Sequence, residues 1–549
     1  MANNQKLRVI PLGGLGEVGK NMTAFEYNNE VIIVDAGLMF PENDMLGIDY
    51  IIPDFNYLMQ NRDRLKIHAL LLTHGHEDHI GAITHILQKI PVPVYGTPLT
   101  CGLAGIKLKN GGMKDHPMHV FKAGETLQFG VFKVESFHVS HSIPDCVGFG
   151  IETPVGMVVH SGDYKFDQTP VDGWPTDFAK MALLSEKGVL ALFADSTNAE
   201  RHGWTPSESV IDGAFDAVFR EARARIIVAT FASLISRVQQ VANAAEFYGR
   251  KIAIAGHSMT ENVKIARRLG YLQIADDTLI SIEESMQMPP EKVVIMATGA
   301  QGEPTAVLSR LAFGNHRQLE IVPGDTVVMS AHPIPGNEEV VSRTMNKLLQ
   351  KGAHVIYDPK AQVHVSGHAS QEEMKLLINL LRPRFFVPIH GELRQLHAHA
   401  DIAYSLGIPE DNIAVVENGT ILEFSKTEMT IGDRIPGGYV FVDGAGVGDI
   451  GPAVMRDREA LGQDGFVMVT ALVNNRTGEV VNGPDITSRG FVFMQESDEL
   501  FNGVRALVRQ LSREYKNGNR EQVIQEAVKK YLYGETKRRP MVFTQMYNT

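Results

Sequence analysis

Short apolar runs separated by Gly, Pro and Asp fill the N-terminal part of the chain. They include LRVIPL, EVIIVDAG, HALLLTHGH, FKVESFHVS, GMVVHSGD and LALFADST. Several runs are apolar throughout, which is typical of strands buried on both faces, and helical patterns separate some of them. The pattern predicts a layered α/β or α+β domain whose first part covers residues 1–205.

A different pattern begins near Pro206. Longer helical stretches, such as residues 207–223, are each followed by a buried-strand run. These runs are RIIVATFA, KIAIAG, KVVIMATG and DTVVMSAHP. Repeated helix-then-strand order predicts a parallel sheet. We therefore expect an inserted α/β domain over residues 206–360, after which the strand-then-His run RFFVPIHGE returns the chain to the first domain over residues 361–440.

The C-terminal part has its own pattern. The Gly-rich stretch PGGYVFVDGAGVGDIGP predicts a linker at residues 441–455. Beyond it lie two strand runs, FVMVTALV and RGFVFM, and two helical patterns at residues 500–515 and 520–533. These elements predict a small α+β domain over residues 456–549.

Composition narrows the class of protein. A chain of 549 residues is too long for one core, and 44% hydrophobic with 21% charged residues is a globular composition. Two cysteines, Cys101 and Cys146, are too few for a disulfide framework or a thiolate metal cluster. We find no signal peptide and no apolar run of about 18 residues, so we expect a cytoplasmic protein without a membrane partner. The net charge of −12 argues against uniform adhesion to nucleic acid but leaves a local basic channel open.

The densest chemical signal is LLTHGHEDH, an apolar run that ends in three histidines and an aspartate. In a short loop, His74 and His76 can reach one cation while Asp78 and His79 face a second. Imidazole and carboxylate groups suit Zn²⁺ at about 2.0–2.2 Å. Such a cluster is costly to fold without metal, because like groups crowd and lose water together. A metal site is therefore favoured over a polar surface loop.

Later strand ends supply further ligands for a two-metal site. The candidates are His141 in SFHVSHSIPD, Asp163 in VVHSGDYKF and His390 in FFVPIHGE. Asp163 can bridge two ions because a carboxylate has two oxygens. His138 and His160 lie nearby in sequence but are placed less clearly. Each residue alone would suit a structural role, and only the whole set favours metal binding.

These motifs resemble known families. THGHEDH, with VDAG at Asp35 before it and His141, Asp163 and His390 after it, resembles the motif series of the metallo-β-lactamase superfamily. ADST at Asp195, VSGH at His368 and PIHGE at His390 resemble motifs A, B and C of the beta-CASP group. Segments from about residue 7 to 540 resemble ribonuclease J in the same order along the chain: GGLGEVGKN, LGIDYIIPD, FAS and RVQQ, TGAQGEP, PIPGNE, HVSGHASQ and GPDITSRGF. The resemblance implies a metallo-β-lactamase αββα sandwich, an inserted beta-CASP α/β domain and a small C-terminal α+β domain.

The resemblance also implies roles for single residues. One zinc would be held by His74, His76 and His141, the other by Asp78, His79 and His390, with Asp163 bridging. Asp35 and Asp195 would orient ligand imidazoles. Asp78, Asp163, Asp195 and His368 would be the catalytic residues, with manganese or magnesium as alternative metals. A separate cation site, with calcium as the candidate ion, is implied near Gly47, Asp49 and Asp443.

The activity implied by the resemblance is that of a zinc-dependent ribonuclease. It would act on single-stranded RNA as a 5′→3′ exonuclease and an endonuclease, favour 5′-monophosphate ends, and serve RNA maturation and decay. Ser233, His364, Val365, Ser366, Gly367 and His368 would bind the substrate. His368 would either protonate the leaving oxygen or hydrogen-bond a phosphate.

Two other functions stay open from the sequence. A two-zinc enzyme could instead take DNA, or a small ester or lactam, although the inserted domain disfavours a small molecule. The chain could also be a non-catalytic RNA-binding subunit, although the complete ligand set argues against that. We expect a homodimer or homotetramer and contacts with other RNA-decay proteins. The C-terminal domain would help to pair subunits or act as a stabilising cap.

Overall fold

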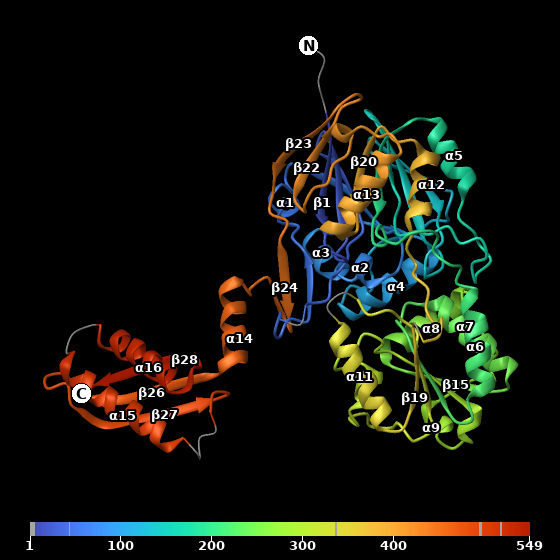
Figure 1. Cartoon of the computed structure of the whole chain (residues 1–549). Coiled ribbons are helices and arrows are strands. Elements are labelled where there is room, and N and C mark those ends of the chain that lie inside the picture. The colour runs from blue at the N-terminus through green and yellow to red at the C-terminus, as the bar shows by residue number, and fades with distance from the viewer. Residues whose placement is uncertain (1–5, 43, 335–336, 359, 493–496, 516–518) are drawn as a thin grey trace, which may run out of the picture. The chain divides into compact units, whose positions relative to one another are not determined.

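The computed structural model of the chain describes residues 6–42, 44–334, 337–358, 360–492, 497–515 and 519–549 (Figure 1). The chain divides into two compact units. The larger unit comprises Met1–Phe40 and Tyr50–Val440, and the smaller comprises Pro41–Asp49 and Phe441–Thr549. The histidines and aspartates of the predicted two-metal site all belong to the larger unit.

One sheet of the larger unit has eight strands. Their order is β23 (Met429–Arg434), β22 (Thr420–Phe424), β1 (Leu7–Gly13), β3 (Met22–Tyr27), β4 (Glu30–Val34), β6 (Lys66–Leu71), β7 (Val94–Gly96) and β8 (Met118–Val120). Pairing is antiparallel from β23 to β4 and parallel from β4 to β8. Because β4 and β6 run in parallel, Asp35 lies beside the end of β6, where its N–H donates to the Leu71 carbonyl.

A second sheet of the larger unit has six strands. Their order is β20 (Phe385–Ile389), β13 (Val189–Asp195), β12 (Gly156–His160), β11 (Val147–Thr153), β10 (Phe132–His138) and β9 (Thr126–Phe129). β10, β12, β13 and β20 run in one direction, whereas β11 runs against them. The carboxyl ends of these four strands therefore meet at one edge of the sheet.

The two sheets share one apolar core. Phe25 of β3 and Phe193 of β13 meet edge to face across it, with ring centroids 6.0 Å apart. Helices complete the layers: α3 (Ile83–Lys89) and α4 (Pro98–Asn110) accompany the first sheet, and α5 (Phe178–Glu186), α12 (Gln371–Leu381) and α13 (Leu393–Ser405) accompany the second. The predicted αββα sandwich is confirmed.

The inserted domain contains a sheet in which every pair of neighbours is parallel. Its order is β16 (Leu279–Ile280), β15 (Lys251–Ala255), β17 (Val293–Ala297), β14 (Ile226–Ala229), β18 (Thr326–Met329) and β19 (His354–Tyr357). The main helices are α6 (Val210–Glu221), α7 (Ile235–Phe247), α8 (His257–Leu269), α10 (Val307–Ala312) and α11 (Glu338–Gln350). From β14 the chain first builds one side of the sheet and then the other. In sheets with such a reversal, ligands bind in a crevice outside the carboxyl ends of the strands.

The smaller unit holds a three-stranded sheet with two helices. The strand order is β27 (Val480–Arg489), β26 (Phe466–Val473) and β28 (Met541–Asn548), and the helices are α15 (Asp498–Glu514) and α16 (Arg520–Thr536). The predicted C-terminal α+β fold is confirmed, but the strand expected at RGFVFM is wrong. β27 ends at Arg489, the first residue of that run, and residues 493–496 lie outside the described chain. The parallel strand β28 was not predicted.

The predicted linker at residues 441–455 contains regular structure. It includes the end of β24 (Tyr439–Asp443), β25 (Gly446–Val447) and the start of α14 (Pro452–Asp464). Pro452 occupies the first helical turn of α14, where its missing N–H costs nothing. The domain boundaries proposed from the sequence stay predictions.

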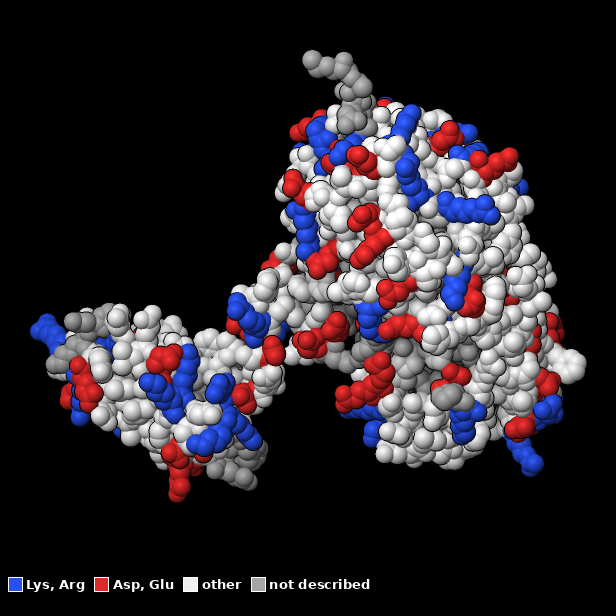
Figure 2. Space-filling view, turned by 45° about the horizontal axis from the view of Figure 1, so that its top comes forward, with Lys and Arg blue, Asp and Glu red and all other residues white. Residues whose placement is uncertain are grey.

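The surface carries mixed charge. On the face drawn in Figure 2, acidic and basic side chains are interspersed over the larger unit. That face presents no field of a single sign, although the whole chain carries a net charge of −12. Among the described residues, no helix combines the length and apolar character needed to span a bilayer.

Candidate metal centre

Asp35 fixes the loop that follows β6. Its two carboxylate oxygens accept hydrogen bonds from the N–H and the hydroxyl of Thr73, at 2.8 and 2.9 Å. The same carboxylate faces Nδ1 of His79 at 2.8 Å. A ring N–H at Nδ1 leaves the lone pair of a neutral imidazole on Nε2, so Asp35 directs His79 Nε2 toward the cluster.

Three histidines form the first group of the cluster. Nδ1 of His76 lies 3.1 Å from Nε2 of His74 and 3.1 Å from Nε2 of His141. Nδ1 of His141 donates to the Gly367 carbonyl at 2.7 Å, which leaves its Nε2 as a bare acceptor. Burial lowers the pKa of His76 to about 4 and those of His74 and His141 well below their usual range. At neutral pH this group therefore presents lone pairs to one point.

The spacing of these nitrogens fits a metal ion. Tetrahedral ligands at about 2.0–2.1 Å from zinc lie roughly 3.3 Å from one another. The two observed separations of 3.1 Å are close to that value. Lone pairs that face one another at this distance repel unless a cation lies between them. The first group thus has the donor chemistry and the spacing of a zinc site.

Asp78, His79, His390 and Asp163 form the second group. Asp78 Oδ2 lies 3.6 Å from His79 Nε2 and 3.3 Å from His390 Nε2, and Asp163 Oδ2 lies 3.1 Å from His79 Nε2. The buried Nε2 of His390 makes no hydrogen bond of good geometry among the described residues, although Asp78 lies close to it. A buried ring nitrogen that is poorly paired is costly, and a metal ion would satisfy it.

Asp163 faces both groups. Its Oδ2 lies 3.7 Å from His74 Nε2 and 3.8 Å from His141 Nε2, in addition to its contact with His79. Its other oxygen contacts Nδ1 of His390 at 2.8 Å. This position between the groups is the one that a bridging carboxylate would need.

The charges also favour cations at this place. Within the described chain, the ion pairs of Asp35, Asp78, Asp163 and Asp195 involve only histidines. Burial alone would lower the pKa of His79, but Asp163, Asp78 and Asp35 raise it well above its usual range. Positive charge is therefore drawn into the cluster, and two divalent ions would supply it. The residues present fit a two-metal centre.

His368 and Asp195 lie beside this cluster. Nδ1 of His368 contacts Asp195 Oδ2 at 2.7 Å, and Asp163 Oδ2 is 4.0 Å away. Burial would lower the pKa of His368, but Asp195 and then Asp163 outweigh it and raise the pKa. Its Nε2 is thereby free to hold a proton for a substrate atom.

The loop of residues 364–368 is fixed against the metal cluster. Asn198 donates to the hydroxyl of Ser366 and to the carbonyl of His368, at 2.8 and 3.0 Å, and Thr205 donates to the same carbonyl at 2.7 Å. A Cβ at Gly367 would lie 2.7 Å from the His141 ring, so only glycine allows this approach. His364 Nδ1 is buried without a partner in the described structure.

Ser233 lies in the turn after β14, at the carboxyl edge of the inserted sheet. The chain leaves the same edge after β19 on its way to Val365. The structure thus brings both predicted substrate-binding segments to the carboxyl edge of that sheet.

The predicted separate cation site lies in the smaller unit. Asp49 accepts a hydrogen bond from the Gly444 N–H at 2.7 Å, and Asp443 pairs with the Arg458 guanidinium at 2.5 Å. A Cβ at Gly47 would lie 2.7 Å from Arg458 Nη1. The guanidinium supplies positive charge beside Asp443, and an ion at this place stays a prediction.

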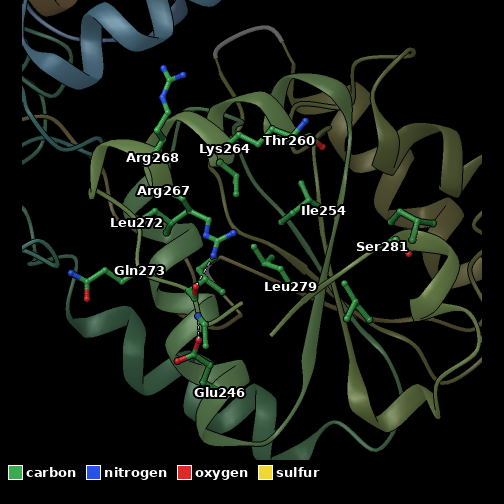
Figure 3. A pocket seen from close by; sticks show the side chains of 15 residues that line it. Glu246, Ile254, Thr260, Lys264, Arg267, Arg268, Leu272, Gln273, Leu279 and Ser281 are labelled. Carbon is green, nitrogen blue, oxygen red and sulfur yellow. Dashed lines mark hydrogen bonds between the residues drawn. The ribbon is translucent and has the colours of Figure 1, made fainter. Parts of the chain in front are cut away.

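An open pocket of about 940 Å³ lies elsewhere in the inserted domain, between α8 and the edge strand β16 (Figure 3). Arg267 points into it and donates to Asp276 and to the Ile274 carbonyl. No residue of the predicted site lines this pocket. It is separate from the metal cluster.

Several residues of the site escaped the sequence analysis. Asn21 places its amide nitrogen 3.1 Å from His79 Nε2, and GGLGEVGKN, in which it lies, was the only signal for it. Thr73, Asn198 and Thr205 carried no signal of their own. The structure also places two uncertain histidines. His138 stacks on Trp174 and contacts the Pro175 carbonyl, and His160 accepts from Gly162, so both have structural roles.

Four segments of the chain match known families. Residues 15–195 match the metallo-beta-lactamase superfamily, and residues 223–348 match the ribonuclease J beta-CASP domain. Residues 354–409 match the Zn-dependent metallo-hydrolase RNA specificity domain, and residues 453–549 match the ribonuclease J C-terminal domain. These segments contain all seven residues of the cluster and the 364–368 loop.

Whole-chain comparisons agree with these matches. The chain is 43% identical to ribonuclease J2 of Bacillus subtilis over 98% of both chains, and 44% identical to ribonuclease J of Thermus thermophilus over 98% of this chain and 94% of the relative. It is 42% identical to ribonuclease J 1 of Streptococcus pyogenes over 97% and 96%. A crystal structure from Enterococcus faecalis V583, described as a protein of unknown function, covers 78% of this chain and all of its own, with a TM-score of 0.53 and 15% identity, and shares the fold alone. The chain therefore belongs to the ribonuclease J family, and it is a metal-dependent ribonuclease of the metallo-β-lactamase superfamily.

Proposed function

We propose that the protein is a zinc-dependent ribonuclease that removes nucleotides from single-stranded RNA in the 5′→3′ direction and also cleaves internally. It favours 5′-monophosphate ends and acts in RNA maturation and decay. One observation carries this proposal. Seven metal-ligating side chains converge beside the 364–368 loop in a chain that aligns with its ribonuclease J relatives almost from end to end.

The proposed ligands divide into two sets with one shared member. His74, His76 and His141 hold one zinc, Asp78, His79 and His390 hold the other, and Asp163 bridges them. When bound, two such ions lower the pKa of water and stabilise charge on a phosphoryl group. Manganese or magnesium are alternatives for the same oxygen and nitrogen donors, and calcium is the candidate for the site near Gly47, Asp49 and Asp443.

The side chains around the ligands orient them and handle the proton. Asp35 fixes the tautomer of His79, and the Gly367 carbonyl does the same for His141. Asp195 favours the protonated form of His368. We propose that His368 Nε2 gives its proton to the leaving 3′ oxygen, so that the products are a 3′-hydroxyl and a 5′-phosphate.

Substrate phosphates would be received at the crevice of the inserted domain. Ser233, His364, Val365, Ser366 and Gly367 lie on its two segments, with His368 next to the metals. A 5′-monophosphate held there would place the first internucleotide bond at the metal cluster. Stacking surfaces and phosphate donors of this kind are how proteins bind single-stranded RNA.

Two further parts of the proposal concern partners. We propose a homodimer or homotetramer and association with other RNA-decay proteins. Size-exclusion chromatography with light scattering would give the number of chains, and a monomer at working concentration would contradict the first part.

The test of the activity compares substrates and metal content. Purified protein should hydrolyse 5′-monophosphorylated single-stranded RNA faster than the matched DNA or a β-lactam, and elemental analysis should find about two zinc ions per chain. Faster turnover of DNA or of the lactam would overturn the assignment. The double variant His76→Ala, Asp78→Ala is the control: residual activity equal to that of the parent would reveal a contaminating nuclease.

A further inference from the structure

Four charged side chains are buried away from the metal cluster. Lys165 and Arg237 are fully buried, and Asp167 and Glu208 are each 3% exposed. Lys165 and Asp167 follow Asp163 in the first domain, whereas Glu208 and Arg237 belong to the inserted domain. The four charges therefore join the two domains inside the larger unit.

Arg237 is the member of this group of four charges that contacts the start of the 364–368 loop. Its Nη1 donates to the Val363 carbonyl at 2.7 Å and to the Ser330 hydroxyl, and its Nη2 pairs with Glu208 at 2.8 Å. Ser330 donates to the same Val363 carbonyl at 2.5 Å. Val363 immediately precedes His364, so the guanidinium holds the start of the 364–368 loop.

Lys165, at the opposite end of the group of four charges, lies next to the proposed metal ligands. Lys165 Nζ is 3.4 Å from Asp167 and 3.5 Å from Glu208, and the Glu208 N–H donates to Asp167 at 2.9 Å. The Lys165 N–H donates to the carbonyl of Ser140, the residue before His141. One continuous set of contacts thus runs from the residues next to the proposed ligands His141 and Asp163 to the predicted substrate-binding loop.

Stability alone does not account for this arrangement. Removing charges from water is costly, and a well-packed apolar set of similar volume would serve the core equally well or better. Charged groups do something that apolar groups cannot, because a guanidinium binds a carboxylate and a backbone carbonyl in fixed directions. The network of charges therefore serves to fix the position of the Val363 carbonyl.

We propose that Arg237 and Glu208 are positioning residues of the ribonuclease site, which hold the 364–368 loop in register with the metal ligands across the junction of the two domains. The proposal rests on the function proposed above. It assigns a role to the RVQQ segment, which begins at Arg237 and lies outside the metal cluster. Without the anchor at Val363 the His364 end of the loop binds RNA phosphates less well, whereas Asn198 and Thr205 still hold Ser366 and His368 beside the metal ligands.

The test measures KM and kcat separately on 5′-monophosphorylated RNA for Arg237→Met, Arg237→Lys and Glu208→Gln. We expect KM to rise on the order of tenfold in Arg237→Met and Glu208→Gln, which corresponds to the loss of one hydrogen bond to a charged phosphate. Zinc content and kcat should change far less. Arg237→Lys keeps the charge but loses the forked geometry, and it should recover part of the loss.

A second ion pair, in which Asp325 is buried and Arg225 is half-buried, supplies the control. Arg225 pairs with Asp325 at 2.5 Å in the same domain and donates to the Glu320 carbonyl, without touching the 364–368 loop. Arg225→Met should destabilise the domain, as Arg237→Met does, and leave KM unchanged. If Arg237→Met does not fold, Glu208→Gln and Arg237→Lys carry the comparison.

The outcomes separate this inference from the proposed function. A fall in kcat with KM unchanged, a loss of zinc in the Arg237 and Glu208 variants, or the same rise in KM in Arg225→Met would overturn the positioning role. Wild-type protein that leaves RNA intact would overturn the ribonuclease assignment itself, and the positioning role with it. A rise in KM confined to the Arg237 and Glu208 variants would support both.

Discussion

Asp35→Asn tests whether the cluster is a metal site. The carboxylate accepts three hydrogen bonds, two from Thr73 and one from His79 Nδ1. An amide has one accepting oxygen, so its NH₂ group would face a ring N–H or a hydroxyl. The variant therefore loses the contact that fixes the His79 tautomer, or leaves a buried donor without a partner at a cost of about 1–3 kcal/mol.

The expected effect on zinc follows from that contact. Losing the group that orients a ligand imidazole weakens metal binding by roughly tenfold to a hundredfold, which is about 1.4–2.7 kcal/mol. Competition with a chromogenic chelator would measure the zinc affinity, and RNA hydrolysis at limiting zinc should fall in parallel. Excess zinc should restore part of the activity, because the seven ligands themselves are intact.

Asp145→Asn is the matched control for this measurement. Asp145 is also a buried aspartate with a left-handed backbone, at φ 70° against 63° for Asp35, and asparagine tolerates that conformation. Its carboxylate accepts from the Leu99 N–H and contacts none of the seven proposed ligands. Zinc affinity equal to wild type in Asp35→Asn, or an equal loss in Asp145→Asn, would refute the reasoning.

Three other predictions test the site and the stability of the fold. His76→Ala with Asp78→Ala should abolish RNA hydrolysis and lower zinc content while gel-shift binding of RNA persists, and loss of binding with full zinc content would contradict it. Gly367→Ala should lower kcat on the order of a hundredfold, because the added methyl group displaces the His141 ring, and unchanged kcat would show that the loop has room to move. Burial would raise the pKa of Glu135, but two lysine ammonium groups outweigh it and lower the pKa to about 2. Because this folded-state pKa lies below the unfolded value near 4.5, the stabilisation is complete above pH 4.5 and is lost as pH falls toward 2. Thermal unfolding of Glu135→Gln should therefore show a deficit at pH 7 that shrinks with acid, and a deficit that is constant with pH would be the contrary result.

Sequence patterns predicted most of the cluster for a simple geometric reason. His141, Asp163 and His390 follow apolar runs, and each run becomes a strand of one sheet. Strands that run in the same direction place the residues that follow them at one edge of the sheet, so these three residues could be expected together without knowing the order of the strands. Asp195 was expected only from the family resemblance.

Other parts of the site depend on contacts that no local pattern contains. Thr205 reaches the carbonyl of His368 across more than a hundred residues of chain, and Arg237 reaches Val363 likewise. Both contacts depend on how the inserted domain packs against the first domain. In the smaller unit, β28 pairs in parallel with β26 across two helices, and a strand at the end of a chain gives no sign of its partner.

Two buried groups of acidic residues in the larger unit differ in how their charge is balanced. Asp167 and Glu208 are matched by Lys165 and Arg237, so that region is neutral as the chain folds. Asp35, Asp163 and Asp195 are equally buried, yet their ion pairs within the described chain involve only imidazoles, several of which burial keeps neutral. Protonated imidazoles can balance part of this charge, because the carboxylates raise the pKa values of His79, His368 and His390. Divalent ions would replace those protons, since the nitrogens that surround the second group are donors that divalent metals accept. Metal binding would therefore add to the stability of this edge, because the ions would bind the folded cluster in preference to the unfolded chain.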